Sequence, residues 1–357
     1  MTKILQIPDF TGHTIYAGID VHKKNWNITL FFEQQYLRKF QQEANPQILI
    51  NHLRNNYPGA HFKLAYEAGF CGFWIQRALT KAGMECIVAN AADVPQTDKD
   101  RRRKNDTTDS KRIGESLSNG SLKPIFIPDP QIESDRSLVR YRHGLHKDLV
   151  RSKERIKSLL HQHGIKIPEQ FDNSNWSHPF IQWLKDLNIS HPSLRLTLSR
   201  MIEQVEYLRK KMLEITRDIR ALLQSERYCY NGKLLMSIPG IGALIAITIL
   251  TEIGSIKRFP TFYHLNSFVG LCPTEFSSGE NERKGSITPR HHAQLRSFMI
   301  EMAWTGIRLD PALTLAYNEY LKRMSGKRAI IRIARKMLNR IHYVLTKQQQ
   351  YVKGVTK

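Results

Sequence analysis

Apolar residues recur at alternating intervals of four and three between positions 201 and 222 of this 357-residue chain. The series is Met201, Val205, Leu208, Met212, Ile215, Ile219 and Leu222, with charged residues between its members. Only a long helix brings every member of such a series onto one stripe, which a partner helix then covers. The spacing therefore predicts a coiled-coil helix in the middle of the chain.

A weaker helical pattern precedes this series. Over residues 134–165, Leu138, Leu145, Leu149, Ile156 and Leu159 lie on one side, and turn residues interrupt positions 168–192. Two helices joined by a short irregular segment pack as antiparallel neighbours, so we expect a helical hairpin over residues 131–226. The pattern fits a core element inside one subunit and a surface for dimerisation equally well.

The segment 12–128 has the pattern of an α/β domain. Strand-like runs at 16–20 and 26–32 suit a hairpin, and a helix over 46–55 precedes a strand that ends at Glu67. A helix over 72–83 and a strand over 84–88 follow. This order predicts a mixed sheet with covering helices. A ribonuclease-H-like, or RuvC-like, sheet fits, although periodicity does not separate it from other α/β folds.

The segment 227–347 is expected to form a third, mainly helical domain. The turn Ile238-Pro239-Gly240-Ile241-Gly242 leads into an apolar helix over 243–253. Such a turn is similar to a helix-hairpin-helix element, whose backbone amides can face a DNA phosphate. A glycine-rich turn before a buried helix is explained equally well by packing.

The chain carries 54 Lys and Arg against 32 Asp and Glu, a formal net charge of +22. Clustered positive charge favours a nucleic-acid partner, although each cluster alone could be a solvated surface. Three clusters are candidates for binding nucleic acid. They are Arg101, Arg102, Arg103 and Lys104; Arg283, Lys284, Arg290 and Arg296; and Arg328, Arg332, Arg335 and Lys336. The four residues of the third cluster lie on one helical face.

Two features argue against zinc and against a membrane. The four cysteines are scattered without metal-ligand spacing, as expected of reduced thiols. The longest apolar stretch, residues 241–250, is too short to span a bilayer, and no signal peptide opens the sequence. We therefore expect a soluble cytoplasmic protein with no membrane partner.

Four carboxylates have the spacing of a metal site. Asp20 and Glu67 each end an apolar, strand-like run, and Asp106 and Asp109 lie three residues apart before a helical pattern. Two strand-end acids and an i, i+3 pair can converge on a divalent cation, although such acids are more often solvated. The basic residues around Asp106 and Asp109 favour a nuclease or strand-transfer site.

A possible nucleophile occurs in Ser277-Ser278-Gly279, which precedes several cations. A polar surface loop explains these residues too, because Ser-Ser-Gly alone is a very weak signal. Read functionally, an exposed hydroxyl lies among arginines and lysines that could hold a phosphate. Thr288 and Pro289 are then expected to open a helix as its N-cap and first residue.

At these residues the chain resembles a known family. Gly18-Ile19-Asp20-Val21-His22-Lys23, Tyr66-Glu67-Ala68 and Lys104-Asn105-Asp106-x-x-Asp109-Ser110 resemble the RuvC-like half of the DEDD insertion-sequence transposases related to the Piv and MooV invertases. The motifs at 238–242, 268–273, 277–279 and 334–338 resemble the transposase domain of the same family. The resemblance covers nearly the whole chain in the right order.

The resemblance implies that Asp20, Glu67, Asp106 and Asp109 bind Mg²⁺, with Mn²⁺ as a substitute. It also implies a serine that joins covalently to DNA, assigned to Ser278 with Ser277 as the alternative. The implied partners are the DNA of the element ends and target, a structured noncoding guide RNA, and further copies of the chain in a dimer or tetramer, in the nucleoid of a bacterial cytoplasm. Ser110 departs from the usual Ala, and the segment 280–282 is unusually acidic.

Two other functions fit the same residues. A Holliday-junction resolvase would use the four acids with a metal-activated water, which would make the Ser-Ser-Gly segment irrelevant. A non-catalytic nucleic-acid-binding protein would keep the charge without the chemistry. The sequence leaves open the target and donor sites, the guide RNA and the number of subunits.

Overall fold

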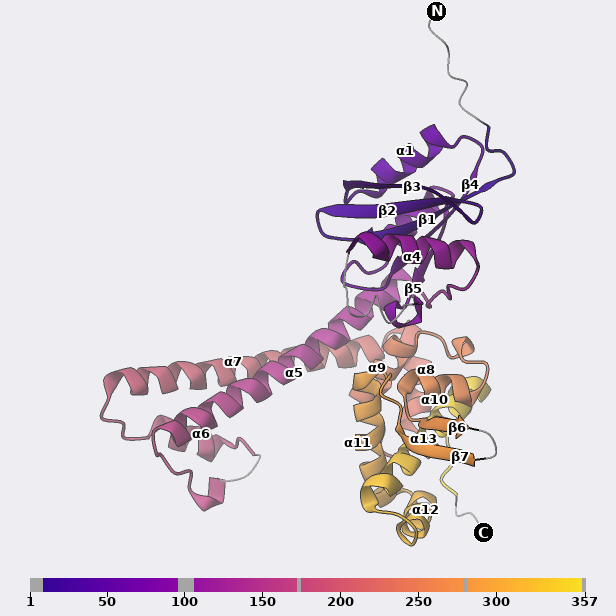
Figure 1. Ribbon diagram of the computed structural model, residues 1–357. Helices are drawn as coiled ribbons and strands as arrows, with labels where there is room; N and C mark the ends of the chain where they lie inside the picture. The colour runs from indigo at the N-terminus through magenta and orange to yellow at the C-terminus, as the bar shows by residue number, and fades with distance from the viewer. Residues whose placement is uncertain (1–8, 96–105, 172–174, 279–280, 355–357) are drawn as a thin grey trace, which may run out of the picture. The chain divides into compact units, whose positions relative to one another are not determined.

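The chain forms two compact units, residues 1–127 and 128–357, in a computed structural model that describes residues 9–95, 106–171, 175–278 and 281–354 (Figure 1). Of residues 106–108, 275–278 and 281–284 it describes the backbone alone. The first unit ends beside the predicted boundary at 128. The helical hairpin and the following domain, which the sequence analysis separated, form one unit with a continuous hydrophobic core.

The first unit contains a five-stranded sheet in the order β3-β2-β1-β4-β5. β1 runs antiparallel to β2 and parallel to β4, so the sheet is mixed, as predicted. The elements are β1 (Thr14–Val21), β2 (Asn25–Phe32), β3 (Gln35–Glu43), α1 (Pro46–Asn56), β4 (His61–Glu67), α2 (Trp74–Lys81), β5 (Glu85–Ala89), a 3₁₀ turn (Ala91–Asp93) and α4 (Asp106–Ser118).

The two faces of this sheet are covered by different helices. Along β1, Ile15, Ala17 and Ile19 are buried in the core that α1 and α2 complete. Successive side chains of a strand point to opposite faces, so Gly18 and Asp20 belong to the other face. α4 packs on that second face, where the absence of a side chain at Gly18 lets the two backbones touch.

β3 is the one strand of this sheet that the sequence analysis did not predict. It lies at the sheet edge, next to β2 only, and most of its residues are exposed. Its sequence, QYLRKFQQE, is polar and basic. Charged residues on an edge strand discourage pairing with other chains, but they also remove the apolar alternation by which a strand is recognised.

The second unit is mainly helical, as predicted. Its elements are α5 (Pro130–Gln162), a 3₁₀ turn (Glu169–Phe171), α6 (His178–Lys185), α7 (Pro192–Leu223), α8 (Glu226–Met236), α9 (Ala243–Ile253), a 3₁₀ turn (Ile256–Arg258), α10 (Phe262–Val269), β6 (Pro273–Ser278), β7 (Asn281–Ile287), α11 (Ala293–Leu309), α12 (Pro311–Leu321) and α13 (Gly326–Lys347).

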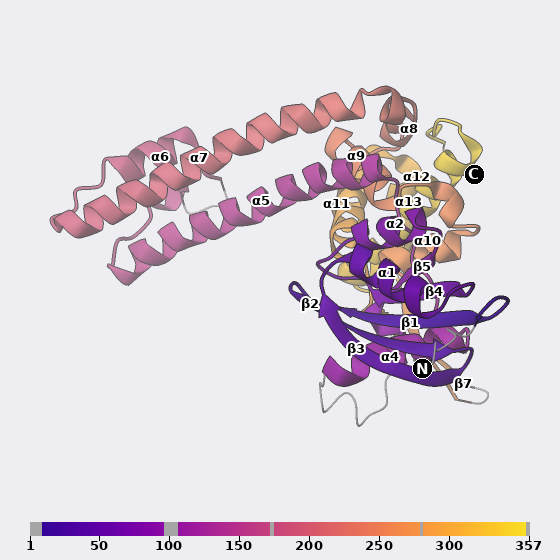
Figure 2. The same cartoon turned by 90° about the horizontal axis from the view of Figure 1, so that it is seen from above.

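The two long helices α5 and α7 lie side by side along their length (Figures 1 and 2). The apolar series of α7 faces this partner: Val205, Ile215 and Ile219 are buried in the same core as Leu145 and Ile156 of α5. The stripe that the sequence analysis identified is thus covered within one chain.

One expected helix start is wrong. Thr288 does not cap a helix: its backbone amide donates to the carbonyl of Cys272, 2.9 Å away, as part of the extended segment after β7. α11 begins four residues later, and His292 is its N-cap, with Nδ1 accepting from the amide of Leu295. Within the described ranges, no helix is long and apolar enough to cross a membrane.

Candidate functional site

Asp20 and Glu67 lie at the same end and on the same face of the sheet. β1 and β4 are parallel neighbours in which Gly18 pairs with Ala65. Each acid follows its paired residue by two positions, so both side chains belong to the face that carries Gly18 and Ala65. That is the face on which α4 packs, since Ala65 shares a cluster with Ile113. The two strand-end acids therefore share one face at one end of the sheet.

Asp20 has two polar neighbours, His22 and Asn27, to which the sequence analysis gave no role in the site. The Nε2 atom of His22 lies 2.9 Å from Oδ2 of Asp20, and the amide of Asn27 donates to the same oxygen at 3.5 Å. His22 follows Asp20 by two residues, and Asn27 is the cross-strand partner of Asp20. The spacing Asp-x-His at a strand end was the available signal, because alternate residues of a strand share a face.

α4 carries the second pair of acids to this face. A Cβ atom on Gly18 would overlap the carbonyl oxygen of Ser110 and the amide nitrogen of Gly114, so β1 and α4 meet at backbone distance. The Ser110 hydroxyl lies 2.9 Å from that of Thr29, the residue paired with Gly18 on β2. Asp109 directly precedes Ser110, so this crossing point fixes its distance from the strands.

The observed partner of Asp109 is a cation of the same helix. The Arg112 guanidinium donates to Oδ1 of Asp109, with both side chains about one-fifth exposed. The Asp106 side chain is outside the described atoms, although its backbone begins α4. Among the side chains that are described, no group of three His, Cys, Asp or Glu is arranged closely enough to hold a metal ion.

The chemistry of the donors nevertheless suits a divalent cation. Asp20 and Glu67 project from adjacent strand ends, and Asp106 and Asp109 occupy the first turn of the helix above them. Oxygen ligands of this kind are preferred by Mg²⁺ and Mn²⁺, and neither cysteine nor paired histidines compete in this set. The residues fit a hard cation, and the Arg112 contact occupies only Oδ1 of the two Asp109 carboxylate oxygens.

The two candidate serines belong to the second unit. Ser277 and Ser278 end β6, and the backbone register places Ser277 opposite Glu282 and Ser278 opposite Asn281 on β7. We had expected the serines to lie in an irregular loop, but both are residues of a strand. Their side chains, and those of Arg283 and Lys284, lie outside the described atoms.

Several hydrogen bonds hold the base of this β6–β7 hairpin. The Thr274 hydroxyl donates to the carbonyl of Ser286 at 3.0 Å, and Nη2 of Arg296 donates to the carbonyl of Thr288 at 2.5 Å. Burial lowers the pKa of the Arg296 guanidinium. Arg296, predicted as a phosphate ligand, thus contributes to the structure at the hairpin base, while Arg290 is exposed.

A buried carboxylate, Glu252, organises the same region. Its Oε1 and Oε2 each accept a 2.7 Å hydrogen bond from Arg140, and Oε2 lies 3.1 Å from Nε2 of His292. Arg136 approaches Oε2 at 3.5 Å. Burial opposes ionisation of Glu252, but the bonds from His292 and Arg140 outweigh it and lower its pKa to about 2. The cluster joins α5, α9 and the start of α11.

Sequence analysis missed Glu252, although a signal existed. It is the one acid within the apolar run of α9, and every residue from Ala246 to Ile253 is buried. An ionised group in such a run must find cationic partners from other elements. Which elements supply them depends on tertiary packing, so Arg136, Arg140 and His292 could not be named in advance.

The basic clusters differ in what the structure shows of them. On α13, Arg328, Arg332 and Lys336 are exposed, while Ile330, Ala334, Met337, Leu338 and Ile341 are buried on the opposite side, as predicted. Arg335 is half-buried and its guanidinium lies 5.7 Å from the ring centroid of Phe262. Arg101, Arg102, Arg103 and Lys104 lie outside the described residues.

Comparisons with known proteins identify the class of protein to which this chain is similar, a DNA transposase. Residues 17–165 match the model of the DEDD transposase domain of IS110 elements, and residues 232–318 match the transposase family IS116/IS110/IS902. Both segments thus match insertion-sequence transposases of the IS110/IS116 family, the first of them as a DEDD transposase domain.

Individual relatives show how far the similarity extends. The transposase for insertion sequence element IS1533 of Leptospira borgpetersenii is 24% identical over 326 residues, which cover 85% of this chain and 92% of that protein. A protein of Sinorhizobium fredii named as transposase y4qE is 27% identical over 245 residues, 69% of this chain but only 58% of its own length. The pilin gene-inverting protein of Moraxella lacunata is 32% identical over 127 residues, 34% of this chain and 38% of that protein.

Proposed function

We propose that this protein cuts and rejoins DNA strands of an insertion sequence with two sets of groups: carboxylates in the first unit and a serine hydroxyl in the second. The observation that carries the proposal is the placement of Asp20 and Glu67 on adjacent parallel strand ends, on the face covered by α4. Acids gathered on one face repel one another unless a cation neutralises them.

Mg²⁺, or Mn²⁺ in its place, is the proposed cofactor, held by Asp20, Glu67, Asp106 and Asp109. When bound, such an ion stabilises negative charge on a phosphate and lowers the pKa of a coordinated hydroxyl. Around it the chain supplies positioning: His22 and Asn27 orient the Asp20 carboxylate through its Oδ2 atom. The Arg112 guanidinium, which donates to Asp109, holds that carboxylate in place.

Ser278 is the proposed nucleophile, with Ser277 as its alternative. Its hydroxyl oxygen attacks the phosphorus, a serine–phosphate bond forms, and the bond to the departing strand's sugar oxygen breaks. The serine proton passes to a carboxylate, and the departing oxygen takes up a proton. The phosphodiester is exchanged rather than hydrolysed, so a strand hydroxyl can reseal the break by the reverse attack.

The basic clusters are the proposed contacts to nucleic acid. Exposed Arg328, Arg332 and Lys336 form a cationic face on α13, and Arg290 lies near the end of the serine hairpin. Phosphate contacts of this kind supply affinity without reading sequence. A structured noncoding RNA that pairs with target and donor DNA is the proposed source of specificity, as the family resemblance implies. The proposed active form is a dimer or tetramer in which one subunit's Ser278 meets another's acids.

The nucleophile is tested with the full chain, its guide RNA and a labelled DNA substrate in Mg²⁺. Wild type should give a protein–DNA adduct that survives a denaturing gel, and Ser278→Ala should abolish it while Ser277→Ala retains it. The reverse result would move the role to Ser277. Cleavage without any adduct would instead favour a resolvase that uses a metal-activated water.

The acids are tested in the same assay. Asp20→Asn and Asp106→Asn should each reduce adduct formation by at least about 100-fold, because each removes a ligand charge from the proposed metal site. Full activity of either variant in Mg²⁺ would contradict the metal proposal. Glu85→Gln changes an exposed acid of the same sheet that pairs with Lys63, and should leave the adduct unchanged.

A further inference from the structure

A pocket of about 840 Å³ opens between α5, α7, α9 and α11 in the second unit, and no residue of the serine hairpin lines it. Its walls carry six cationic or titratable basic side chains: Arg142, His143, His146, Lys147, Arg151 and Arg220. Glu301 is the one acid in the wall, and it accepts a hydrogen bond from the Ser297 hydroxyl at 3.2 Å.

Most of this positive charge is not neutralised by the protein. Within the described residues, Arg142, Lys147 and Arg220 form no ion pair. Arg151 has an exposed contact of 3.4 Å with Asp148, of the kind that contributes little. Burial and the nearby Lys147, His146 and Arg142 lower the pKa of His143, as expected where positive potential is high. The pocket therefore favours an anionic occupant.

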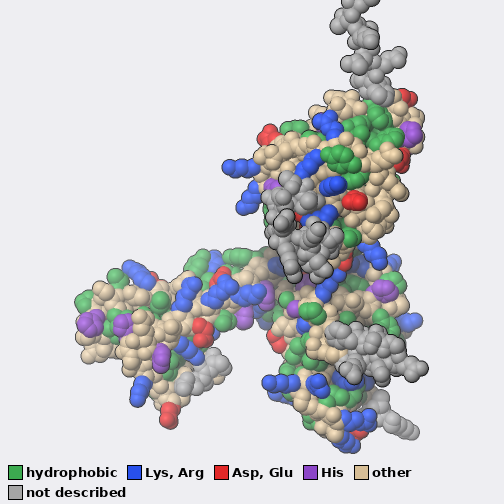
Figure 3. Space-filling view, viewed as in Figure 1, with side chains coloured by type: hydrophobic (Ala, Val, Ile, Leu, Met, Phe, Trp, Pro, Cys, Tyr) green, Lys and Arg blue, Asp and Glu red, His purple; other side chains and the backbone are tan. Residues whose placement is uncertain are grey.

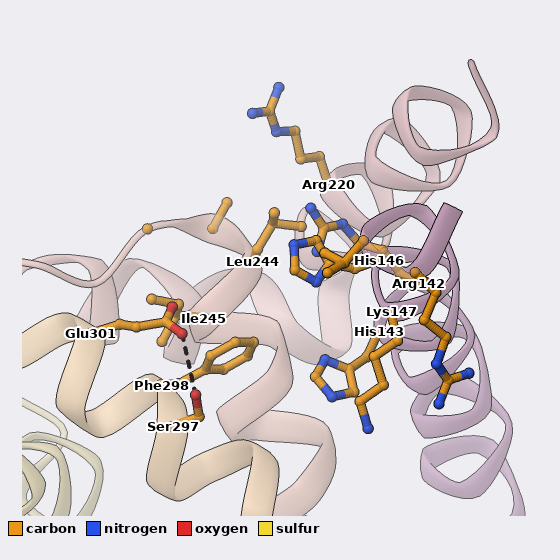
Figure 4. Close-up of a pocket in the computed structure, with 14 residues that line it drawn as sticks. Arg142, His143, His146, Lys147, Arg220, Leu244, Ile245, Ser297, Phe298 and Glu301 are labelled. Carbon is orange, nitrogen blue, oxygen red and sulfur yellow. Dashed lines mark hydrogen bonds between the residues drawn. The ribbon is translucent and has the colours of Figure 1, made fainter. Parts of the chain in front are cut away.

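The interior of the pocket is apolar. Val150, Leu244, Ile245 and Phe298 contribute to its lining, and the ring of Phe298 makes an edge contact with His143, with centroids 6.5 Å apart. Figure 4 shows the basic side chains entering from α5, with Phe298, Ser297 and Glu301 on α11 opposite and Leu244 of α9 between them. A free inorganic anion would not use this apolar surface.

The turn that resembles a helix-hairpin-helix element opens into the same pocket. Gly242 is the N-cap of α9, no described side chain caps that helix, and residues 242–245 line the wall. The first amides of a helix carry partial positive charge, so this end adds to the potential created by the basic side chains. In the space-filling view, Lys, Arg and His side chains recur along the paired helices that lead to it (Figure 3).

We propose that this pocket binds one nucleotide of an unpaired DNA strand, with one of its two flanking phosphates on Lys147, the other on Arg220, and the base against Phe298 and Leu244. Aromatic contact with a base combined with cationic contact to its phosphate is how proteins hold single strands. Duplex DNA presents its bases stacked and paired, so a concave apolar pocket could not receive them. The choice of DNA rests on the proposed strand exchange, which separates paired strands.

Binding is tested by fluorescence anisotropy with the full chain and a short fluorescent oligodeoxynucleotide across a salt series. The double variant Lys147→Ala/Arg220→Ala should weaken binding about tenfold and reduce the salt slope by about 1.4, or about 0.7 for each lost phosphate contact. Arg217→Ala on α7 and Arg155→Ala on α5 are matched controls, since both are exposed and neither lines the pocket. Equal losses in the controls would overturn the assignment.

The base position is tested by photo-crosslinking with 5-iododeoxyuridine in the same oligonucleotide. Mass spectrometry should locate the crosslink at Phe298, His143 or His146, and Phe298→Leu should lose it without loss of fold by circular dichroism. A crosslink elsewhere, or tighter binding to RNA of the same sequence, would contradict the proposal. These assays measure binding and need no strand cleavage, so Ser278→Ala should bind the oligonucleotide as wild type does. If the cleavage assay gave no covalent adduct, that result would contradict the serine proposal and leave the pocket proposal unaffected.

Discussion

The hydroxyl oxygens of Thr29 and Ser110 lie 2.9 Å apart, with both side chains fully buried where α4 crosses β1 and β2. The pair ties the helix that carries Asp109 to the strand beside Asp20. Ser110 occupies a position where the transposase family that this chain resembles usually has Ala. In this chain Thr29 makes the serine a required partner, because a buried hydroxyl without a hydrogen bond is costly.

This pair predicts that Ser110→Ala destabilises the protein even though it introduces the residue usual in the family. We expect a loss of about 1–2 kcal/mol in the free energy of unfolding, since the Thr29 hydroxyl would lose its partner. Thr29→Val/Ser110→Ala should recover most of that loss. Urea unfolding of the four proteins of the cycle measures the coupling, and strictly additive effects would show that the contact contributes nothing.

A second prediction concerns the backbone contact at Gly18. Gly18→Ala should cost more than about 3 kcal/mol, because its methyl group would overlap backbone atoms of Ser110 and Gly114 that cannot move without displacing α4. Gly69→Ala, with open space around the added methyl, is the matched control and should lie within about 0.5 kcal/mol of wild type. Denaturant unfolding followed by circular dichroism compares them. A tolerated alanine at 18 would mean that α4 shifts freely over the sheet.

A third prediction is a pH dependence at Glu252. The folded pKa of about 2 is below the ordinary value of 4.5, so this carboxylate stabilises the fold above pH 4.5, and the stabilisation disappears as pH falls toward 2. The difference corresponds to about 3 kcal/mol. Glu252→Gln should therefore be less stable than wild type at pH 7, by an amount that shrinks toward pH 2.

The measurement is urea unfolding of both proteins at several pH values. Glu214→Gln serves as a control, because that carboxylate is on the surface and pairs only with neighbours on its own helix, such as Lys211. It should change stability by less than about 0.5 kcal/mol. A difference between Glu252→Gln and wild type that stays constant from pH 7 to pH 3 would show that its ionisation is not linked to folding.

A fourth prediction separates metal binding from catalysis. Titration of the DNA-free protein with Mn²⁺, followed by electron paramagnetic resonance, should show a site that Asp20→Asn and Glu67→Gln each weaken by about tenfold or more. Glu85 begins β5, at the end of the sheet opposite to Asp20 and Glu67. Glu85→Gln should therefore bind Mn²⁺ as wild type does. Equal Mn²⁺ binding by all four proteins would remove the support for a carboxylate metal site.

Much of the sheet could be predicted because burial leaves a periodic trace. The apolar runs that end at Asp20 and Glu67 are buried strands, and parallel neighbours necessarily bring their carboxyl ends together. β3 was missed because an exposed edge strand has no apolar period. The start of α11 was misplaced because Thr288-Pro289 is a good local signal for a helix start, but the hairpin base recruits Thr288 for a β-type hydrogen bond instead.

The environment of the site could be predicted only in part. The Asp-x-His spacing suffices to suggest His22, but the contact of Asp109 with Arg112 competes with any other ligand for Oδ1, and spacing does not decide such a competition. The basic pocket was invisible in the sequence, because its cations come from α5 and from Arg220 of α7, which follows Arg151 by 69 residues, and its interior comes from α9 and α11. Only tertiary packing brings these side chains together.

The pairing of α5 with α7 has a consequence for assembly. The apolar stripe of α7 packs on α5 inside the chain, so we expect the hairpin to fold without a second subunit. Folding and association then become separate equilibria, and the melting temperature of the free protein should not depend on its concentration. Concentration-independent melting would show that a single copy of the chain is stable before any assembly takes place.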